Sequence, residues 1–163
     1  IVALGGILLP DEVDIQRTRV IPATPAQVYD LLAEPAAWDK WAPWFQRDPF
    51  LEKKPLGEKS GPGARLAWRG KEQEGRMMVT SAMPVSAVRL MINVPEHGEL
   101  NVYMDLKPVA GGTEVTWGLH GEFGRNYGRR YHGLFYRGRI GDEIDAGLNG
   151  LTEYLRNQPV PEH

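Results

Sequence analysis

Few residues of this chain combine a type and a spacing that could support catalysis. His120 and Glu122 stand two positions apart in an alternating segment, so they would share one face of a strand, as a proton relay or a pair of metal ligands requires. They occupy the polar positions of that segment, and we therefore expect a solvated sheet surface there. The other histidines, His97, His132 and His163, show no metal-binding spacing, so no metal site is predicted.

Two acidic pairs are the remaining candidates for acid–base chemistry. Glu72 and Glu74 flank a predicted turn between two strands, where exposed charge is common. Asp142 and Asp145 lie near the beginning of the predicted final helix, where negative charge interacts favourably with the helix dipole. The chain contains no cysteine, which excludes thiolate nucleophiles, disulfides, iron–sulfur clusters and cysteine-bound zinc. The sequence therefore predicts no catalytic residue and no cofactor.

Any site must be built on the strands of the second half of the chain. Short turn-like stretches join five alternating segments there, which predicts an antiparallel meander. The predicted strands span residues 64–69, 75–83, 87–94, 99–107 and 113–123. Residues 46–63, just before them, mix prolines and glycines with charges, so we expect a long loop or a loose hairpin.

The first part of the chain predicts one strand and two short helices. The strand covers 13–21, and Thr24 is a natural N-cap for a helix that begins at Pro25. Pro35 ends this helix, and 36–41 forms a second short one. We expect the three tryptophans at positions 38, 41 and 44 to fill the core beside the sheet.

The last predicted element is an amphipathic helix from about residue 140 to 156. Its apolar stripe has helical spacing and consists of Ile140, Ile144, Leu148, Leu151 and Leu155. Gly147 and Gly150 would let this helix pass close to the sheet or to a ligand. Because the sheet is the only large apolar surface available to it, we predict an α+β fold in which a curved antiparallel sheet wraps around a long C-terminal helix, with two short helices after the first strand.

One face of the predicted sheet is almost entirely apolar. Alternate positions place Met83 and Phe123 on it, and Ser81 is its only clear polar group. Core packing and the lining of a cavity give the same sequence pattern, so both interpretations stay open. As candidate cavity residues we take Trp68, Met77, Val79, Ser81, Leu90, Ile92, Met104, Val115, Trp117 and Leu119 from the sheet, and Ile144, Leu148 and Leu151 from the helix.

The order of these elements and several short motifs resemble a known superfamily. The motifs are ATPAQVY at 23–29, WDKWAPW at 38–44, GPGA at 61–64, GTEVTW at 112–117 and GLNGL at 147–151. In this order they resemble the helix-grip fold of the START/Bet v 1-like (SRPBCC) superfamily, most closely its polyketide cyclase/dehydrase-like bacterial members. The likeness covers roughly residues 14–157, which is nearly the whole domain.

This resemblance implies a cavity between the sheet and the last helix that takes a hydrophobic small molecule. Lipids, polyketides, quinones and sterols are the ligand types of the superfamily, and its members include carriers, cyclases and co-chaperones. We therefore expect binding or transport of a hydrophobic small molecule. A polyketide cyclase or dehydratase and a protein-interaction or co-chaperone-like module are the alternatives, because a fold alone does not assign function.

The segment 124–141 mixes arginines with aromatic residues and contains no acidic residue. The simplest interpretation is a solvated linker before the last helix. Basic and aromatic residues together also suit an anionic membrane surface or an acidic ligand head group, with Arg125, Arg129, Arg130 and Arg137 as the candidate contacts. Nucleic acid is not expected, since the segment is short and carries no nucleic-acid-binding motif.

Length and composition indicate one domain. The chain has 163 residues, 42% of them hydrophobic, and a net charge of −2 that points to no particular partner. We expect the domain at 13–158 and a tail at 159–163. Residues 1–12 begin with an apolar run, 1–9, that is too short to span a bilayer. The segment predicts either an arm packed on the domain or the remnant of an anchor or signal. A cytoplasmic location and a membrane-associated one are both compatible with these features.

Overall fold

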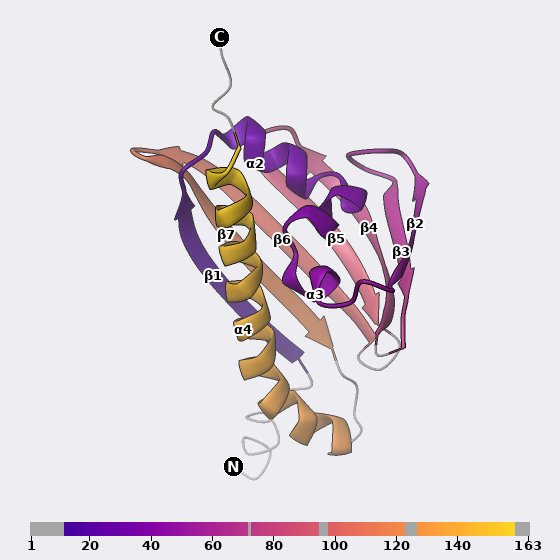
Figure 1. The fold of residues 1–163 in the computed structure, drawn as a ribbon. Coiled ribbons are helices and arrows are strands. Elements are labelled where there is room, and N and C mark those ends of the chain that lie inside the picture. Colours follow the sequence, from indigo (N-terminus) through magenta and orange to yellow (C-terminus); the bar gives the residue numbers. More distant parts are fainter. Residues whose placement is uncertain (1–11, 72, 95–97, 123–126, 159–163) are drawn as a thin grey trace, which may run out of the picture.

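Seven antiparallel strands form one curved sheet in the computed structural model, which describes residues 12–71, 73–94, 98–122 and 127–158 (Figure 1). The order of the strands across the sheet is β1-β7-β6-β5-β4-β3-β2. The strands are β1 (Glu12–Ile21), β2 (Glu52–Gly57), β3 (Ala64–Arg69), β4 (Glu74–Met83), β5 (Ala87–Val94), β6 (Gly98–Val109) and β7 (Gly112–Glu122). Strands β2 to β7 are neighbours in chain order, which confirms the predicted meander.

Two short helices and one four-residue turn of helix follow β1. They are α2 (Pro25–Leu32), the 3-10 helix η1 (Pro35–Lys40) and α3 (Pro43–Gln46). Thr24 caps α2 as predicted, because its hydroxyl accepts from the backbone N–H of Gln27 at 3.2 Å and the Gln27 side chain accepts from the backbone N–H of Thr24 at 2.9 Å. The elements α2, η1 and α3 lie over one part of the sheet, and the long helix α4 (Tyr127–Arg156) packs against β1 (Figure 1).

Helix α4 begins at Tyr127, well before residue 140. The interpretation of residues 124–141 as a solvated linker is therefore wrong for the backbone of 127–139. Tyr127, Tyr131 and Phe135 have helical spacing, but the glycines among them are poor helix formers, so the composition of this stretch concealed the earlier turns. Arg125 lies outside the described residues, as do the side chains of Arg129, Arg130 and Arg137, and head-group contact by these arginines stays a prediction. Residues 1–11 and 159–163 also lie outside the described part.

Strand β2 lies within the stretch 46–63, which was predicted to be a long loop or a loose hairpin; it forms a hairpin, but with β3, which follows that stretch. It pairs with β3, with Lys53 opposite Trp68 and Lys54 opposite Ala67. All six residues of β2 are exposed, and the strand contains Pro55. Lysine and proline are common on edge strands because they discourage pairing with a further strand. The sequence of such a strand therefore resembles that of a loop.

The structure overturns the predicted orientation of Ser81 and Met83. The pairing of β4 with β5 shifts register between Val79, which lies opposite Leu90, and Ser81, which lies opposite Arg89. Such a bulge adds one residue and reverses which positions face the core. Ser81 is consequently exposed and Met83 is 64% exposed, so the expectation that Ser81 lines a cavity is wrong.

Because of the bulge, replacing methionine by glutamine should affect stability strongly on one side of it in β4 and hardly at all on the other. Met77→Gln should lower the free energy of unfolding by about 2–3 kcal/mol, because Met77 is 2% exposed and its replacement buries an amide. Met83→Gln should change it by less than about 0.5 kcal/mol, as exposed positions usually do. Urea unfolding of both variants measures this, and equal losses would contradict the reversed register.

The predicted GTEVTW segment ties the beginning of β7 to the first part of the chain. Gly112 has a φ of 147°, and a Cβ at this position would collide with the backbone carbonyl of Ile21. The next residue, Thr113, is fully buried, and its hydroxyl donates to the carbonyl oxygen of Ala23 at 2.8 Å. These contacts fix the end of β1 and the start of α2 on the edge of the sheet.

Candidate ligand pocket

An apolar pocket of about 220 Å³ lies between the sheet and the middle of α4. Strands β3 to β7 supply its sheet side, while η1, α3 and α4 supply the opposite side. Its walls are mostly aromatic and aliphatic, and its polar residues are few. The lining residues are Trp38, Trp44, Trp68, Gln73, Glu74, Met77, Ile92, Val94, Leu100, Val102, Trp117, Leu119, Ile140, Glu143 and Ile144.

Six of the residues predicted to line a cavity lie in the wall of this pocket. They are Trp68, Met77, Ile92, Trp117, Leu119 and Ile144. Six others are buried in the same core but do not line the pocket: Val79, Leu90, Met104, Val115, Leu148 and Leu151. The alternation of the strands identified the correct face of the sheet, and it did not indicate which part of that face is left open.

Sequence reasoning missed several lining residues for different reasons. Leu100 and Val102 occupy the inward positions of β6, so the alternation itself identifies them. Trp38 and Trp44 were predicted as core residues. Trp38 is fully buried, as expected, and both tryptophans also form part of the pocket wall. Glu143 lies at the pocket because α4 crosses the sheet there, a placement that no local pattern reveals.

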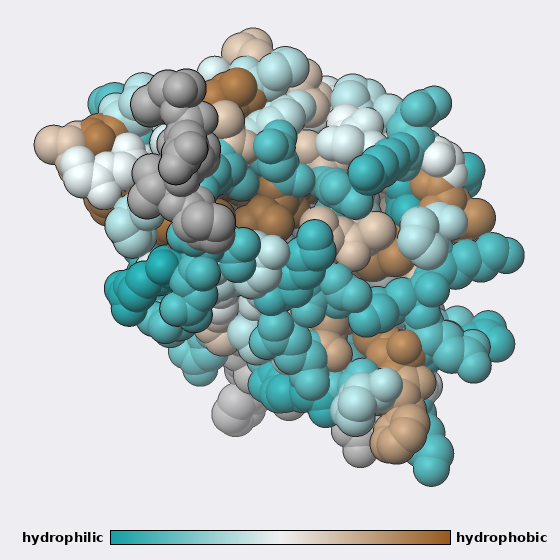
Figure 2. Space-filling model, turned by 45° about the horizontal axis from the view of Figure 1, so that its top comes forward, coloured by the Kyte–Doolittle hydropathy of each residue, from teal (hydrophilic) through white to brown (hydrophobic). Residues whose placement is uncertain are grey.

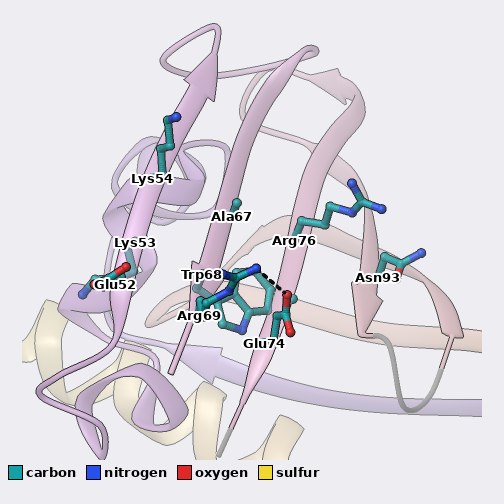
Figure 3. Close-up of a pocket in the computed structure, with 10 residues that line it drawn as sticks. Glu52, Lys53, Lys54, Ala67, Trp68, Arg69, Glu74, Arg76 and Asn93 are labelled. Atoms are coloured by element: carbon teal, nitrogen blue, oxygen red, sulfur yellow. Dashed lines mark hydrogen bonds and ion pairs between the residues drawn. The ribbon is translucent and has the colours of Figure 1, made fainter. Parts of the chain in front are cut away.

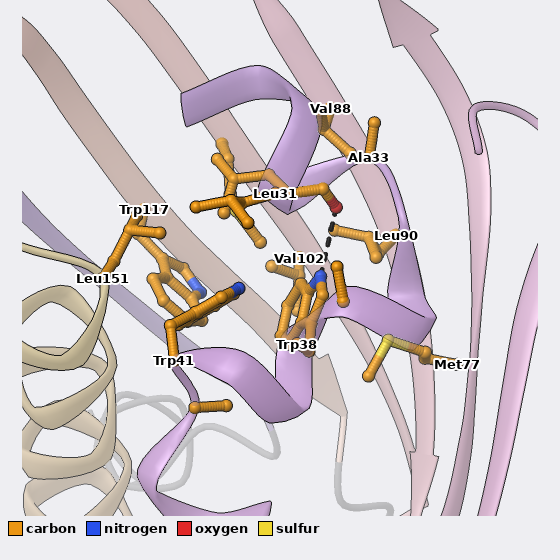
Figure 4. Packing of buried hydrophobic residues seen from close by; sticks show 14 of the residues in the cluster. Leu31, Ala33, Trp38, Trp41, Met77, Val88, Leu90, Val102, Trp117 and Leu151 are labelled. Carbon is orange, nitrogen blue, oxygen red and sulfur yellow. Dashed lines mark hydrogen bonds between the residues drawn. The ribbon is translucent and has the colours of Figure 1, made fainter. Parts of the chain in front are cut away.

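A cluster of tryptophans explains why the pocket is small. The ring centroids of Trp38 and Trp41 are 4.8 Å apart, and each lies 5.8 Å from Trp117 in an edge-to-face arrangement. Trp44 lies 6.2 Å from Trp117. Figure 4 shows Trp38, Trp41 and Trp117 together among the buried aliphatic side chains. Large rings in favourable edge contacts thus fill much of the space between the sheet and α4.

Two glycines of α4 allow the helix to approach this cluster; Gly147 does so against the sheet, as predicted, and Gly150 against the segment after η1. A Cβ on Gly147 would lie 2.9 Å from the ring of Trp117 and 3.3 Å from that of Trp44. A Cβ on Gly150 would collide with the backbone carbonyl of Trp41. Any side chain at these positions would push the helix away from the wall of the pocket.

The polar side chains that line the pocket, those of Gln73, Glu74 and Glu143, each interact with a neighbouring residue. Gln73 donates from its side-chain nitrogen to the carbonyl oxygen of Trp44 at 2.8 Å. Glu143 accepts from Arg47 through both carboxylate oxygens, each at 3.0 Å. Glu74 pairs with Arg69 at 3.4 Å. These ion pairs are largely exposed, so they contribute little to stability and mainly hold side chains around the pocket.

The catalytic candidates of the sequence do not meet in this pocket. His120 follows the lining residue Leu119 on β7, so its side chain faces the other side of the sheet. Asp145 lies 3.5 Å from Arg17, and Asp142 is exposed. Glu74 does line the pocket, while its partner Glu72 lies outside the described residues. Among the described residues, the acidic side chains that line the pocket are those of Glu74 and Glu143, and both have an arginine partner.

Within the described ranges, no group of three or more histidine or acidic side chains is arranged to hold a metal ion. None of the helices in those ranges has the length and apolar composition needed to cross a membrane.

A second hollow, of about 580 Å³, lies on strands β2 to β5 and has a different character (Figure 3). A row of paired residues crosses it, in the order Lys54, Ala67, Arg76 and Asn93. The small side chain of Ala67 lies between the long basic ones. Charged walls of this kind do not suit an apolar ligand.

Comparison with solved structures shows the same fold in several bacterial proteins. A protein from Rhodobacter sphaeroides matches with a TM-score of 0.67 and 22% identity, over 90% of this chain and 94% of that one. Protein CV1439 from Chromobacterium violaceum matches with a TM-score of 0.66 and 16% identity, over 90% and 99%. The Aha1 dimer from Colwellia psychrerythraea matches with a TM-score of 0.61 and 17% identity, over 89% of this chain and 97% of that one. No curated protein matches the chain.

The sequence of the chain also matches a protein family over almost its whole length. The matched residues are 12–156, which begin with β1 and end with the last residue of α4. The helix-grip arrangement of the elements agrees with this match and with the predicted SRPBCC superfamily. The chain belongs to the family described as polyketide cyclase/dehydrase and lipid transport.

Proposed function

We propose that this protein binds a small hydrophobic molecule in the pocket between the sheet and α4. The observation that carries the proposal is the pocket itself, whose walls are aromatic and aliphatic side chains from eight elements of the fold. Membership of a family of cyclases, dehydrases and lipid-transport proteins supports it. Apolar walls with a few polar groups are typical of sites for small molecules.

The size of the pocket limits the ligand. Pockets for drug-sized molecules usually measure about 300–1,000 Å³, and this one measures about 220 Å³. A molecule of one or two rings, or a short acyl chain, fits this volume. A complete two-chain lipid does not, because the tryptophan cluster occupies the space that its chains would need.

Binding without chemistry agrees best with the polar groups present. A general acid or base has to reach the reacting atoms of the ligand, and only Glu74 and Glu143 line the pocket among the carboxylates of the described residues. Each is held by an arginine. A cyclase or dehydratase that uses Glu143 is the second candidate, because this residue lies on α4 directly beside the lining residue Ile144.

A protein-interaction module has less support. The large apolar side chains that are exposed in the described residues are scattered over several elements: Val20, Phe50, Leu56, Met83 and Val85. Figure 2 shows polar residues over much of the face in view, with apolar ones in separate patches. Interaction surfaces usually offer a larger continuous apolar area.

Native mass spectrometry of freshly purified protein tests the proposal. We expect a population heavier than the polypeptide by the mass of one small organic molecule, which extraction with organic solvent removes. The extracted protein should then bind bicyclic hydrocarbons such as tetralin. A protein that repeatedly carries no ligand and binds no such hydrocarbon would contradict the proposal and favour the interaction module.

A further inference from the structure

One carboxylate lies on the side of α4 that faces the pocket. Ile140, Glu143 and Gly147 are three and four positions apart, a spacing that places them on one face of a helix. Ile140 and Glu143 line the pocket, and a Cβ on Gly147 would lie 3.3 Å from the ring of Trp44 and 2.9 Å from that of Trp117. Glu143 therefore brings a negative charge to a helix face that otherwise consists of apolar residues and glycine.

The carboxylate of Glu143 lies at the opening of the pocket. Its side chain is 45% exposed, whereas Ile140 and Ile144 on the same helix are buried. Arg47 donates to both carboxylate oxygens from a single nitrogen, Nη2, at 3.0 Å each. Arg47 is 62% exposed and does not line the pocket, so it approaches Glu143 from outside. Because a carboxylate has about four positions for donors, Glu143 keeps room for a second donor on the side of the pocket.

Tryptophan rings surround the space beside this carboxylate. Trp38, Trp44, Trp68 and Trp117 line the pocket. The face of a tryptophan ring carries partial negative charge and attracts cations more strongly than that of any other aromatic residue. None of the described lysines, arginines and histidines lines the pocket. The opening of this apolar pocket is therefore favourable to a positive charge.

Glu74 is less well placed for the same role. It borders the pocket, but it also borders the outer hollow of Figure 3, where it pairs with Arg69 at 3.4 Å. Glu143 has no such second hollow beside it, and its place on the stripe of α4 directs it to the pocket.

An ammonium group suits the opening better than a carboxylate group. It has three donors and no acceptor, and like that of lysine it stays protonated at neutral pH. Exposed ion pairs are weak, so sharing Glu143 between Arg47 and a ligand costs little. An acidic ligand would instead meet the carboxylate of Glu143, while Arg47, which could attract it, is already paired outside the pocket.

We propose that the ligand of this pocket is a hydrophobic amine, whose ring or chain lies among the tryptophans and whose ammonium group pairs with Glu143 at the opening. This inference rests on the proposed function and adds the charge of the ligand to it. It assigns a role in specificity to Glu143, since a neutral or acidic molecule of the same shape gains nothing from this carboxylate.

Three bicyclic molecules that share one ring system and differ in charge test the proposal at pH 7. They are 2-aminotetralin, which is a cation, tetralin, which is neutral, and tetralin-2-carboxylate, which is an anion. In calorimetric titrations of the wild-type protein, we expect 2-aminotetralin to bind at least about fivefold more tightly than tetralin, and tetralin-2-carboxylate to bind more weakly than tetralin. Glu143→Gln keeps the shape of the side chain and removes its charge, so it should reduce the preference for the amine to less than about twofold while the affinity for tetralin changes little.

Asp142→Asn is the matched control, because it removes the same charge from the adjacent, exposed position of α4. This variant should keep the preference of the wild-type protein for 2-aminotetralin. Equal affinities of the wild-type protein for the amine and tetralin would overturn the amine proposal and leave hydrophobic binding intact. Tighter binding of tetralin-2-carboxylate would overturn it too, and would indicate Arg47 as the partner of an acidic ligand. Equal losses in the two variants would show a general effect of charge rather than a contact with Glu143, and failure of all three molecules to bind would overturn the proposed function as well.

Discussion

Replacing Gly150 with alanine is expected to lower the free energy of unfolding by about 2–3 kcal/mol. A methyl group at this position would collide with the backbone carbonyl of Trp41, which cannot move independently of η1 and its two neighbouring tryptophans. Overpacking of a close contact usually costs about 1–3 kcal/mol. Because alanine favours a helix by about 1 kcal/mol over glycine, a net loss would show that the contact outweighs helix propensity.

Gly141, on the same helix, provides the matched control for this prediction. The nearest atom to a Cβ there is the guanidinium nitrogen Nη2 of Arg17, at 2.5 Å, at the far end of a flexible and largely exposed side chain. Gly141→Ala should therefore change stability by no more than about 0.5 kcal/mol, or raise it by up to about 1 kcal/mol. Chemical denaturation of both variants measures the difference. Equal effects of the two substitutions would mean that α4 does not touch the backbone of Trp41.

The sequence predicts the fold well because most of its elements follow local rules. Thr24 and Gln27 form a capping box that also sets the start of α2, and the alternation of β3 and β5 to β7 places their apolar residues inward. The apolar stripe from Ile140 to Leu155 identifies the part of α4 that packs on the sheet. In each case a short stretch of chain contains the whole signal.

The errors arise where a structure depends on residues far away in the chain. The bulge in β4 is a property of its pairing with β5, so nothing around Ser81 announces that the inward positions change there. The residues of β2 are all exposed, and they form a strand because they pair with β3. The first turns of α4 mix aromatic residues at helical spacing with glycines and arginines, a composition that also suits a loop.

The sequence predicts which face of the sheet borders the pocket, but not where on that face the open space lies. Alternation assigns both Val79 and Met77 to the interior, but only Met77 lines the pocket. The difference depends on Trp38 and Trp41, at the end of η1, and on Trp117, far away on β7, whose rings pack together and fill part of the core. Open space in a core is the result of all its side chains, so one strand pattern cannot locate it.

Closing the pocket is expected to remove ligand binding while the fold remains. Ile92 lies on β5, opposite Met77 on one side and Leu100 on the other, and all three line the pocket. In Ile92→Trp the larger ring would occupy much of the 220 Å³. If it excludes roughly 100 Å² of apolar ligand surface, the loss is about 2.5 kcal/mol, which is more than tenfold in affinity.

Met91→Trp is the control, because the adjacent residue points to the opposite face of the same strand, between Met78 and Asn101. This variant should keep both the copurified ligand in native mass spectra and the affinity for tetralin, whereas Ile92→Trp should lose both. Tetralin is the appropriate probe since it has no polar group, so the result depends on the space alone. Retention of the ligand by Ile92→Trp would place the binding site elsewhere. Loss in both variants would point to a disturbance of the sheet, which a comparison of their unfolding transitions with that of the wild-type protein would reveal.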